Sequence, residues 1–139
     1  MTAVTPLPTR PFADSTDSLL RFFMRLDATL TGFAGLLIAA AADPISSRTG
    51  LSSIAEYGIG AFFVLCGLLV FGLAAAPDLR RAGIGVVIAN IVFTVGAVVV
   101  VAADALPLTA TGIAATLASG VYTALIGYLQ YLGVRRLPA

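Results

Sequence analysis

Histidine, lysine and tryptophan are absent from this 139-residue chain, and Cys66 is its single cysteine. Without His and with one Cys, the chain alone cannot build a His-ligated haem, an ordinary zinc site, a Ser/His protease triad or a CxxC redox centre. One cysteine also excludes an intramolecular disulfide. The sequence therefore offers no catalytic residues, no metal ligands and no cofactor site, which removes many familiar membrane enzymes.

Charge is scarce as well. Charged residues make up 11% of the chain and hydrophobic residues 59%, and the mean hydropathy is +1.02. A soluble four-helix bundle would interrupt its apolar stripes with charge at every turn, whereas here the charges lie between long apolar runs. Because the net charge is only +1 and no basic patch is present, no nucleic-acid partner is expected. The composition predicts an all-α integral membrane protein surrounded by the lipid bilayer.

Four apolar segments are long enough to cross a bilayer, at about residues 18–42, 54–76, 82–103 and 108–132. Asp43-Pro44, Pro77 and Pro107 separate them. We expect residues 14–139 to form a single compact four-helix transmembrane bundle. Residues 1–13 hold three of the seven prolines in a polar setting, which predicts a disordered tail.

The arginines predict an orientation. Seven of the eight lie before the strictly apolar part of the first helix, between the second and third helices, or after the fourth, and only Arg48 lies on the other side. The positive-inside rule then places both termini in the cytoplasm. An alternative is a signal peptide ending at Ala39–Ala42, but Asp27 interrupts its apolar run and the preceding region is long.

Asp27 is the acid that the sequence places within the first span, where a charged Asp at the centre costs about 3 kcal/mol on insertion scales. It should therefore find a partner or be protonated. The candidate intramembrane cluster comprises Asp27, Thr31, Asn90, Thr94, Tyr128 and Gln130. Two interpretations remain open: a proton-titrating or ligand-binding group, or a hydrogen-bonded lock between helices or ion pair with Arg21 or Arg25. Tyr122 and Tyr131 fit interfacial anchoring and packing.

Small residues recur on one side of several helices, where they permit close backbone approach in lipid. The candidate packing positions are Gly35, Gly60, Gly67, Ser119, Gly120 and Thr123. Because the fourth helix carries two rows of small residues, we expect it to be central or to form an oligomer contact.

The stretch RLDATLTGFAGLLIAAAADPISSRTG, Arg25 to Gly50, resembles the first helix and loop of small actinobacterial four-helix integral membrane proteins that generally lack an assigned function. The absence of lysine and the abundance of alanine are typical of a high-GC genome such as an actinobacterium's. The resemblance implies a class and a location in the cell membrane rather than an activity.

Three function classes follow. The favoured interpretation is a non-catalytic accessory subunit or partner-binding scaffold, acting with a membrane protein partner or as a homo-oligomer. The alternative is a small proton-coupled transporter or ligand-binding protein that uses Asp27 and resembles the small multidrug resistance family. Three features of this chain depart from that family: it has no Trp, its acid lies near the membrane interface, and its arginines are strongly biased to one side. A lipid- or quinone-acting enzyme ranks last, because no catalytic pair can be assembled.

Overall fold

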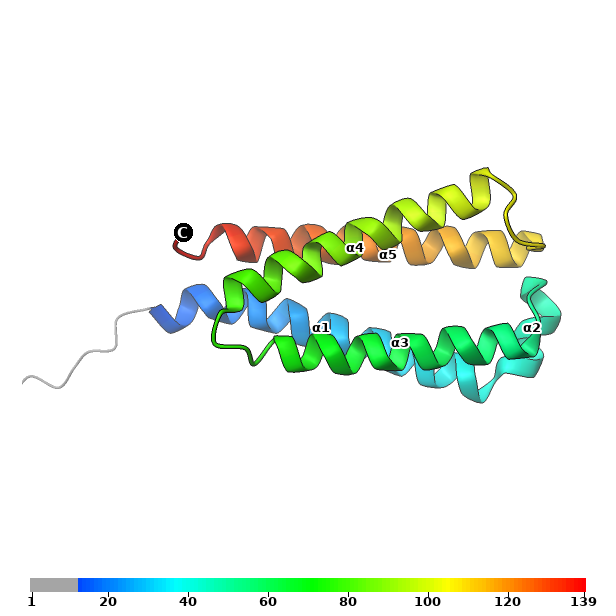
Figure 1. Ribbon diagram of the computed structural model, residues 1–139, viewed down its shortest axis with the longest axis horizontal. Helices are drawn as coiled ribbons and strands as arrows, with labels where there is room; N and C mark the ends of the chain where they lie inside the picture. Colours follow the sequence, from blue (N-terminus) through cyan, green and yellow to red (C-terminus); the bar gives the residue numbers. More distant parts are fainter. Residues whose placement is uncertain (1–12) are drawn as a thin grey trace, which may run out of the picture.

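The computed structural model describes residues 13–139, which form five helices (Figure 1). They are α1 (Ala13–Ala40), α2 (Ala42–Thr49), α3 (Ser53–Leu73), α4 (Leu79–Ala102) and α5 (Ala110–Arg135). Four of them, α1, α3, α4 and α5, are long and apolar enough to cross a membrane. This architecture indicates a multi-pass membrane protein. Most of the expected N-terminal tail, residues 1–12, lies outside the described residues, whereas Ala13 is already the first residue of α1.

Capping side chains fix the helix starts that the hydropathy pattern left imprecise. The third span begins at Leu79 rather than at residue 82, because the Asp78 side chain accepts a hydrogen bond from the Arg81 backbone N–H. The last span begins at Ala110 rather than 108, where the Thr109 hydroxyl accepts from the Gly112 N–H.

Helix α2 was not predicted, since Asp43-Pro44 had indicated a helix end followed by a loop. Pro44 instead lies in the first turn of this eight-residue helix, where a missing N–H costs little. The helix closes at Gly50, whose φ of 87° is left-handed. The Thr109 backbone N–H donates to the Thr49 carbonyl at 2.9 Å, and the Thr109 hydroxyl donates to the Arg48 carbonyl. Helix α2 therefore ties the first half of the chain to the start of α5.

Gly50 is a position where substitution should be costly. A Cβ there would lie 2.2 Å from the Pro107 carbonyl oxygen, in addition to the left-handed backbone. We expect Gly50→Ala to lower the free energy of unfolding by about 2 kcal/mol, from backbone strain and overpacking together. Thermal unfolding followed by circular dichroism in mild detergent measures this. Gly58→Ala is the matched control, since a Cβ at Gly58 meets nothing within 4 Å; equal melting of the two variants would contradict the prediction.

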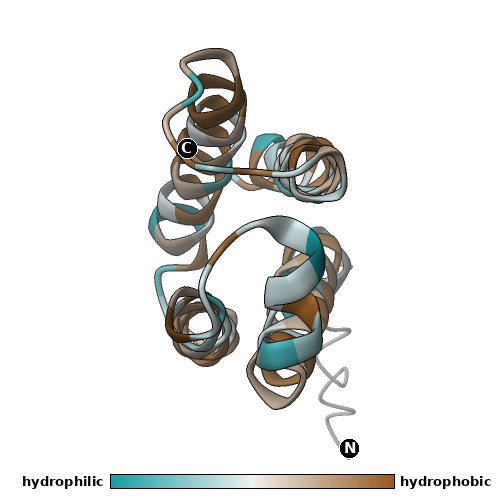
Figure 2. Cartoon of the chain, turned by 90° about the vertical axis from the view of Figure 1, so that its right-hand side faces the viewer, coloured by the Kyte–Doolittle hydropathy of each residue, from teal (hydrophilic) through white to brown (hydrophobic). Residues whose placement is uncertain are grey.

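The spans associate as two antiparallel pairs, α1 with α3 and α4 with α5 (Figure 1). Seen end-on, the four spans stand at the corners of a bundle, with hydrophilic colour concentrated in the connecting segments (Figure 2). Glycines permit the closest approach within the first pair: a Cβ on Gly35 would lie 2.6 Å from the Gly60 carbonyl oxygen, and a Cβ on Gly60 would lie 2.6 Å from the Gly35 oxygen. The two backbones are therefore in direct contact at this level.

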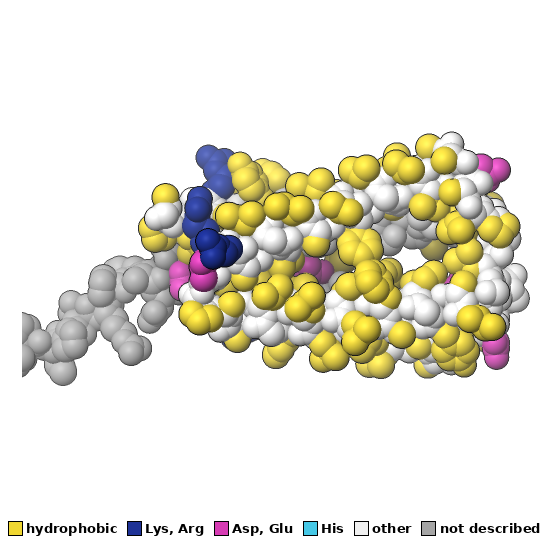
Figure 3. Space-filling model, viewed as in Figure 1, with side chains coloured by type: hydrophobic (Ala, Val, Ile, Leu, Met, Phe, Trp, Pro, Cys, Tyr) yellow, Lys and Arg dark blue, Asp and Glu magenta, His cyan; other side chains and the backbone are white. Residues whose placement is uncertain are grey.

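The two ends of the bundle differ. The end that carries the start of α1, the α3–α4 connection and the C-terminus is here called the terminal end, and the opposite end is called the α2 end (Figure 1). A cluster of buried apolar residues closes the terminal end: Leu20, Met24, Ala74, Leu79, Val86, Val87 and Val134. Farther toward the α2 end, the space-filling view shows the molecule hollowed between the two helix pairs (Figure 3).

Candidate functional site

The centre of the polar site is the Asp27 carboxylate on α1, which is only 4% exposed. Its Oδ1 accepts hydrogen bonds from the Thr31 hydroxyl at 3.0 Å and from the Tyr122 hydroxyl at 2.8 Å. Its Oδ2 accepts from Asn90 Nδ2 at 3.2 Å and from Gln130 Nε2 at 2.8 Å. Asn90 Nδ2 also donates to Gln130 Oε1 at 2.8 Å. This set, Asp27, Thr31, Asn90, Tyr122 and Gln130, is called the Asp27 cluster below.

Helical periodicity explains how three spans supply this cluster. Thr31 lies one turn after Asp27 on α1, and Tyr122 and Gln130 lie two turns apart on one face of α5. Asn90 is the contribution of α4, and it is 7% exposed. Each span thus presents a polar face toward the other two, and the cluster joins α1 to the α4–α5 pair.

Hydrogen bonding in the cluster is complete. Four donors meet the two carboxylate oxygens, which present about four lone-pair sites. Among the described residues, no buried side-chain nitrogen or oxygen lacks a hydrogen-bond partner. Since an unsatisfied polar group in the bilayer costs several kcal/mol, the arrangement stabilises the contact between the two helix pairs. The geometry is that of an internal hydrogen-bonded junction.

The ion-pair interpretation of Asp27 is not what the structure shows. Arg21 instead donates to the Ala74 carbonyl oxygen at 2.6 Å and lies 3.7 Å from the Asp17 carboxylate. The Arg25 side chain is exposed. Neutral donors from within the bundle, rather than a guanidinium, surround the Asp27 carboxylate.

The structure brings together four of the six residues proposed for the cluster, namely Asp27, Thr31, Asn90 and Gln130. Thr94 lies one turn farther along α4, where its hydroxyl donates to the Asn90 carbonyl and lies 2.8 Å from the Thr123 hydroxyl. Tyr128 does not join the cluster, because its side chain is 59% exposed on the outer side of α5. Its place is taken by Tyr122, which the sequence had suggested for anchoring. The sequence signal for including Tyr122 in the Asp27 cluster is its spacing of eight residues, about two helical turns, from Gln130.

No protein-family model, curated protein or solved structure matches this chain.

Five of the six positions proposed for helix packing are turned inward. A Cβ on Gly67 would lie 2.8 Å from the Gly32 Cα, so Gly67 joins Gly35 and Gly60 in the α1–α3 contact. On α5, a Cβ on Gly120 would lie 3.1 Å from the Ala97 Cβ, and Thr123 bonds across to Thr94. Ser119 is exposed on the outer face of α5, where its hydroxyl donates to the Thr116 carbonyl.

A second buried acid lies at the α2 end. Glu56, in the first turn of α3, is 4% exposed and accepts a hydrogen bond from the Thr49 hydroxyl at 2.5 Å. Gly67 packs at the level of Ala28, and Glu56 lies eleven residues from Gly67, about 17 Å along α3. Glu56 and Asp27 are thus too far apart to act as a pair. Among the described residues, no three His, Cys, Asp or Glu side chains gather closely enough to hold a metal ion.

Proposed function

We propose that this chain is a non-catalytic integral membrane protein that acts by associating with another membrane protein or with further copies of itself. The observation that carries the proposal is the saturation of Asp27 by four donors of its own bundle. A carboxylate whose acceptor positions are all taken has none left for a substrate. The other buried acid among the described residues, Glu56, accepts a hydrogen bond from the Thr49 hydroxyl at the α2 end. The part of the bundle left free to contact other molecules is therefore its outer helix surface rather than a reactive centre.

The outer face of α5 is the surface on which we place the partner. Toward the α2 end its exposed residues include the small Ala114, Ala115, Ala118 and Ser119, which lie between the larger exposed side chains of Ile113, Leu117 and Val121. In lipid, small residues allow a second helix to approach closely, and a hydroxyl offers an interhelical hydrogen bond. Neighbouring helix faces carry larger exposed side chains such as Val92, at 63% exposure, and Leu68, at 67%.

Cross-linking in the native membrane, followed by mass measurement in mild detergent, tests this assignment. We expect the native chain to migrate as a complex and Ser119→Leu to shift it toward the monomer. Val92→Leu, which adds bulk on an exposed face of α4, is the matched control and should leave the complex intact. A native chain that is strictly monomeric, with nothing co-purifying, would refute the proposal.

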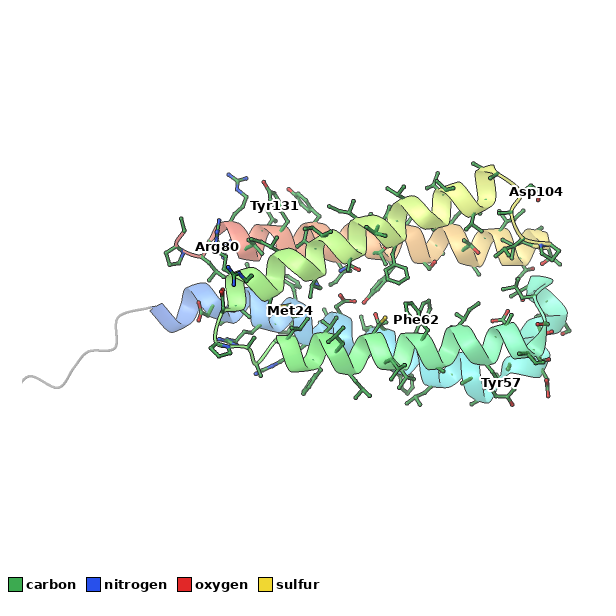
Figure 4. The ribbon with its side chains drawn as sticks, in the orientation of Figure 1. Met24, Tyr57, Phe62, Arg80, Asp104 and Tyr131 are labelled. Atoms are coloured by element: carbon green, nitrogen blue, oxygen red, sulfur yellow. The ribbon has the colours of Figure 1, made fainter. Side chains whose placement is uncertain are left out.

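A ligand-binding or proton-coupled role for Asp27 is the second candidate, and the hollow between the helix pairs favours it. Acidic atoms are visible between the two layers in Figure 3. The Tyr122 ring is only partly buried. Phe62 of α3, which Figure 4 labels, has its ring centroid 5.8 Å from that of Phe93 of α4. A ligand entering between the pairs would reach Asp27 by displacing the Tyr122 hydroxyl.

Proton flux in proteoliposomes distinguishes the two candidates. For the non-catalytic role, we expect the native protein and Asp27→Asn to give the same passive proton leak in the presence of candidate cationic substrates. Substrate-dependent flux in the native protein that is lost in Asp27→Asn would instead establish the transport role, provided that both proteins retain the same circular dichroism spectrum.

We further propose that the protein resides in the cell membrane with the terminal end, and hence both termini, in the cytoplasm. Of the seven arginines in the described residues, six lie toward that end of the bundle and only Arg48 lies at the α2 end, which supports this orientation. Figure 4 shows Arg80 and Tyr131 at the terminal end and Asp104 at the α2 end. A fluorescent reporter that matures only in the cytoplasm, fused to Ala139, should give signal, whereas periplasmic alkaline phosphatase at the same site should stay inactive. The reverse pattern would invert the topology.

A further inference from the structure

Two surface hollows follow one another along the same face of α1. The first, about 420 Å³, lies at the terminal end and is lined by Asp17, Ser18, Arg21, Phe22 and Arg25. The second, about 300 Å³, lies between α1 and α3 and is almost wholly apolar; its lining includes Thr29, Gly32, Leu36, Gly67 and Phe71. Positions 18, 22, 25, 29, 32 and 36 advance by three or four residues, so they form one continuous stripe on the helix.

Arg25 is the unusual residue of this stripe. It is exposed, and among the described residues its guanidinium has no hydrogen-bond acceptor and no acidic partner. Leu20 packs against Gly83 and Gly133, which lie two residues from Arg81 and Arg135 in the sequence. Arg25 is five residues farther along α1, about 7.5 Å deeper into the bilayer. A guanidinium at this depth requires an anionic or carbonyl acceptor, and lipid headgroups are the groups available there.

Arg21 adds a second, oriented guanidinium to the first hollow. Its Nη1 donates to the Ala74 carbonyl at 2.6 Å, which fixes the group beside the C-terminal end of α3. Among the residues that line this hollow, Asp17 is the one acid, and its carboxylate lies 3.7 Å from Arg21 Nη2. The hollow therefore has a net positive charge and carries further N–H donors, the chemistry that binds phosphate.

The second hollow exists because its floor lacks side chains. Gly32 and Gly67 face each other across the α1–α3 contact, and a Cβ on Gly67 would lie 2.8 Å from the Gly32 Cα. Phe33, Leu36, Leu68 and Phe71 line the hollow. From Thr29 to Leu36 the groove extends about 10 Å toward the membrane centre. An apolar groove that begins one turn beyond a basic pocket matches a molecule with an anionic head and a hydrocarbon tail.

We propose that this face of α1 binds one anionic phospholipid, with its phosphate on Arg21 and Arg25 and one acyl chain in the groove floored by Gly32 and Gly67. The charge of the first hollow selects an anionic headgroup. The apolar groove, lying in register with it, selects a lipid over a soluble phosphate.

Native mass spectrometry of the full chain in mild detergent tests the site. Phosphatidylglycerol and phosphatidylcholine of identical acyl chains are titrated separately, and inorganic phosphate is titrated in a third series. We expect one phosphatidylglycerol per chain, bound about fivefold to tenfold more tightly than phosphatidylcholine, as one or two arginine–phosphate contacts provide. Arg25→Gln should abolish this preference. Binding of inorganic phosphate as tight as that of the lipid would overturn the proposal.

Two matched controls distinguish a specific lipid-binding site from nonspecific electrostatic attraction of anionic lipids to the arginines. Arg80→Gln removes an exposed arginine at the same end of the bundle that lines neither hollow, and it should leave the preference intact. Gly32→Leu fills the groove and should weaken lipid binding, whereas Gly72→Leu, at an open position on α3, should not. Equal losses for Arg25→Gln and Arg80→Gln, or equal binding of the two lipids by the native chain, would refute a specific site. Because Arg25 is exposed, its variant should fold even if Gly32→Leu does not.

Discussion

Replacing Asp27 with leucine should lower the free energy of unfolding by about 2–3 kcal/mol. Four donors on three spans lose their acceptor, and interhelical hydrogen bonds in membranes contribute on average about 0.6 kcal/mol each, with a maximum near 1.7. Unpaired buried donors add a desolvation cost of about 1 kcal/mol or more. Unfolding by denaturing detergent in mixed micelles, followed by circular dichroism, measures the difference. Asp43→Leu is the control, because Asp43 is exposed on α2.

A double-mutant cycle establishes that the loss comes from the cluster itself. Asp27→Leu and Gln130→Leu should be non-additive, with a coupling energy of about 1 kcal/mol, because each removes the partner of the other. Asp27→Leu and Tyr128→Leu should be additive, since Tyr128 lies outside the cluster. Additivity for the first pair would mean that Asp27 is not a junction between the helices, and the ligand-binding alternative would gain support.

Gly60→Val should be at least as disruptive, at about 3 kcal/mol. The Cβ of any residue at this position would lie 2.6 Å from the Gly35 carbonyl oxygen and 2.7 Å from the Ala39 backbone nitrogen. Neither atom belongs to a flexible side chain, so α1 and α3 would have to separate along the contact. Overpacking of this kind typically costs about 1–3 kcal/mol, and the backbone-to-backbone contact places the variant at the upper limit.

Gly58→Val provides the matched comparison on the same helix. A Cβ at Gly58 meets nothing within 4 Å, so added bulk there faces the lipid. We expect this variant to unfold within about 0.5 kcal/mol of the native chain, as surface substitutions usually do. If both valine variants melt alike, the close contact between α1 and α3 is not a determinant of stability.

Much of the architecture was predictable from the sequence because the bilayer imposes simple requirements. A helix crossing about 30 Å of hydrocarbon needs about 20 apolar residues, so the number and approximate limits of the spans followed directly from the hydrophobic runs. Polar side chains inside a lipid bilayer are stable only when they hydrogen-bond to other polar groups. The contact of Asp27, Asn90 and Gln130 was therefore predictable from their similar depths along the helices.

The remaining details depended on contacts between residues distant in sequence. Periodicity indicates which face of a helix is polar but not how each face is rotated toward its neighbours, so Tyr122 rather than Tyr128 binds Asp27. Similarly, Asp43-Pro44 predicts a helix end, whereas the structure forms the short helix α2 there, whose C-terminal Thr49 accepts a hydrogen bond from Thr109.

The sequence by itself therefore determined that the protein consists of lipid-embedded helices with one polar cluster, since both features arise from the energetic cost of exposing polar groups to hydrocarbon. Only the tertiary structure decided that α1 pairs with α3, that the bundle closes at the terminal end, and that Asp27 is fully satisfied. These outcomes depend on which glycines allow two backbones to touch, and that is a property of the assembled helices rather than of any one segment.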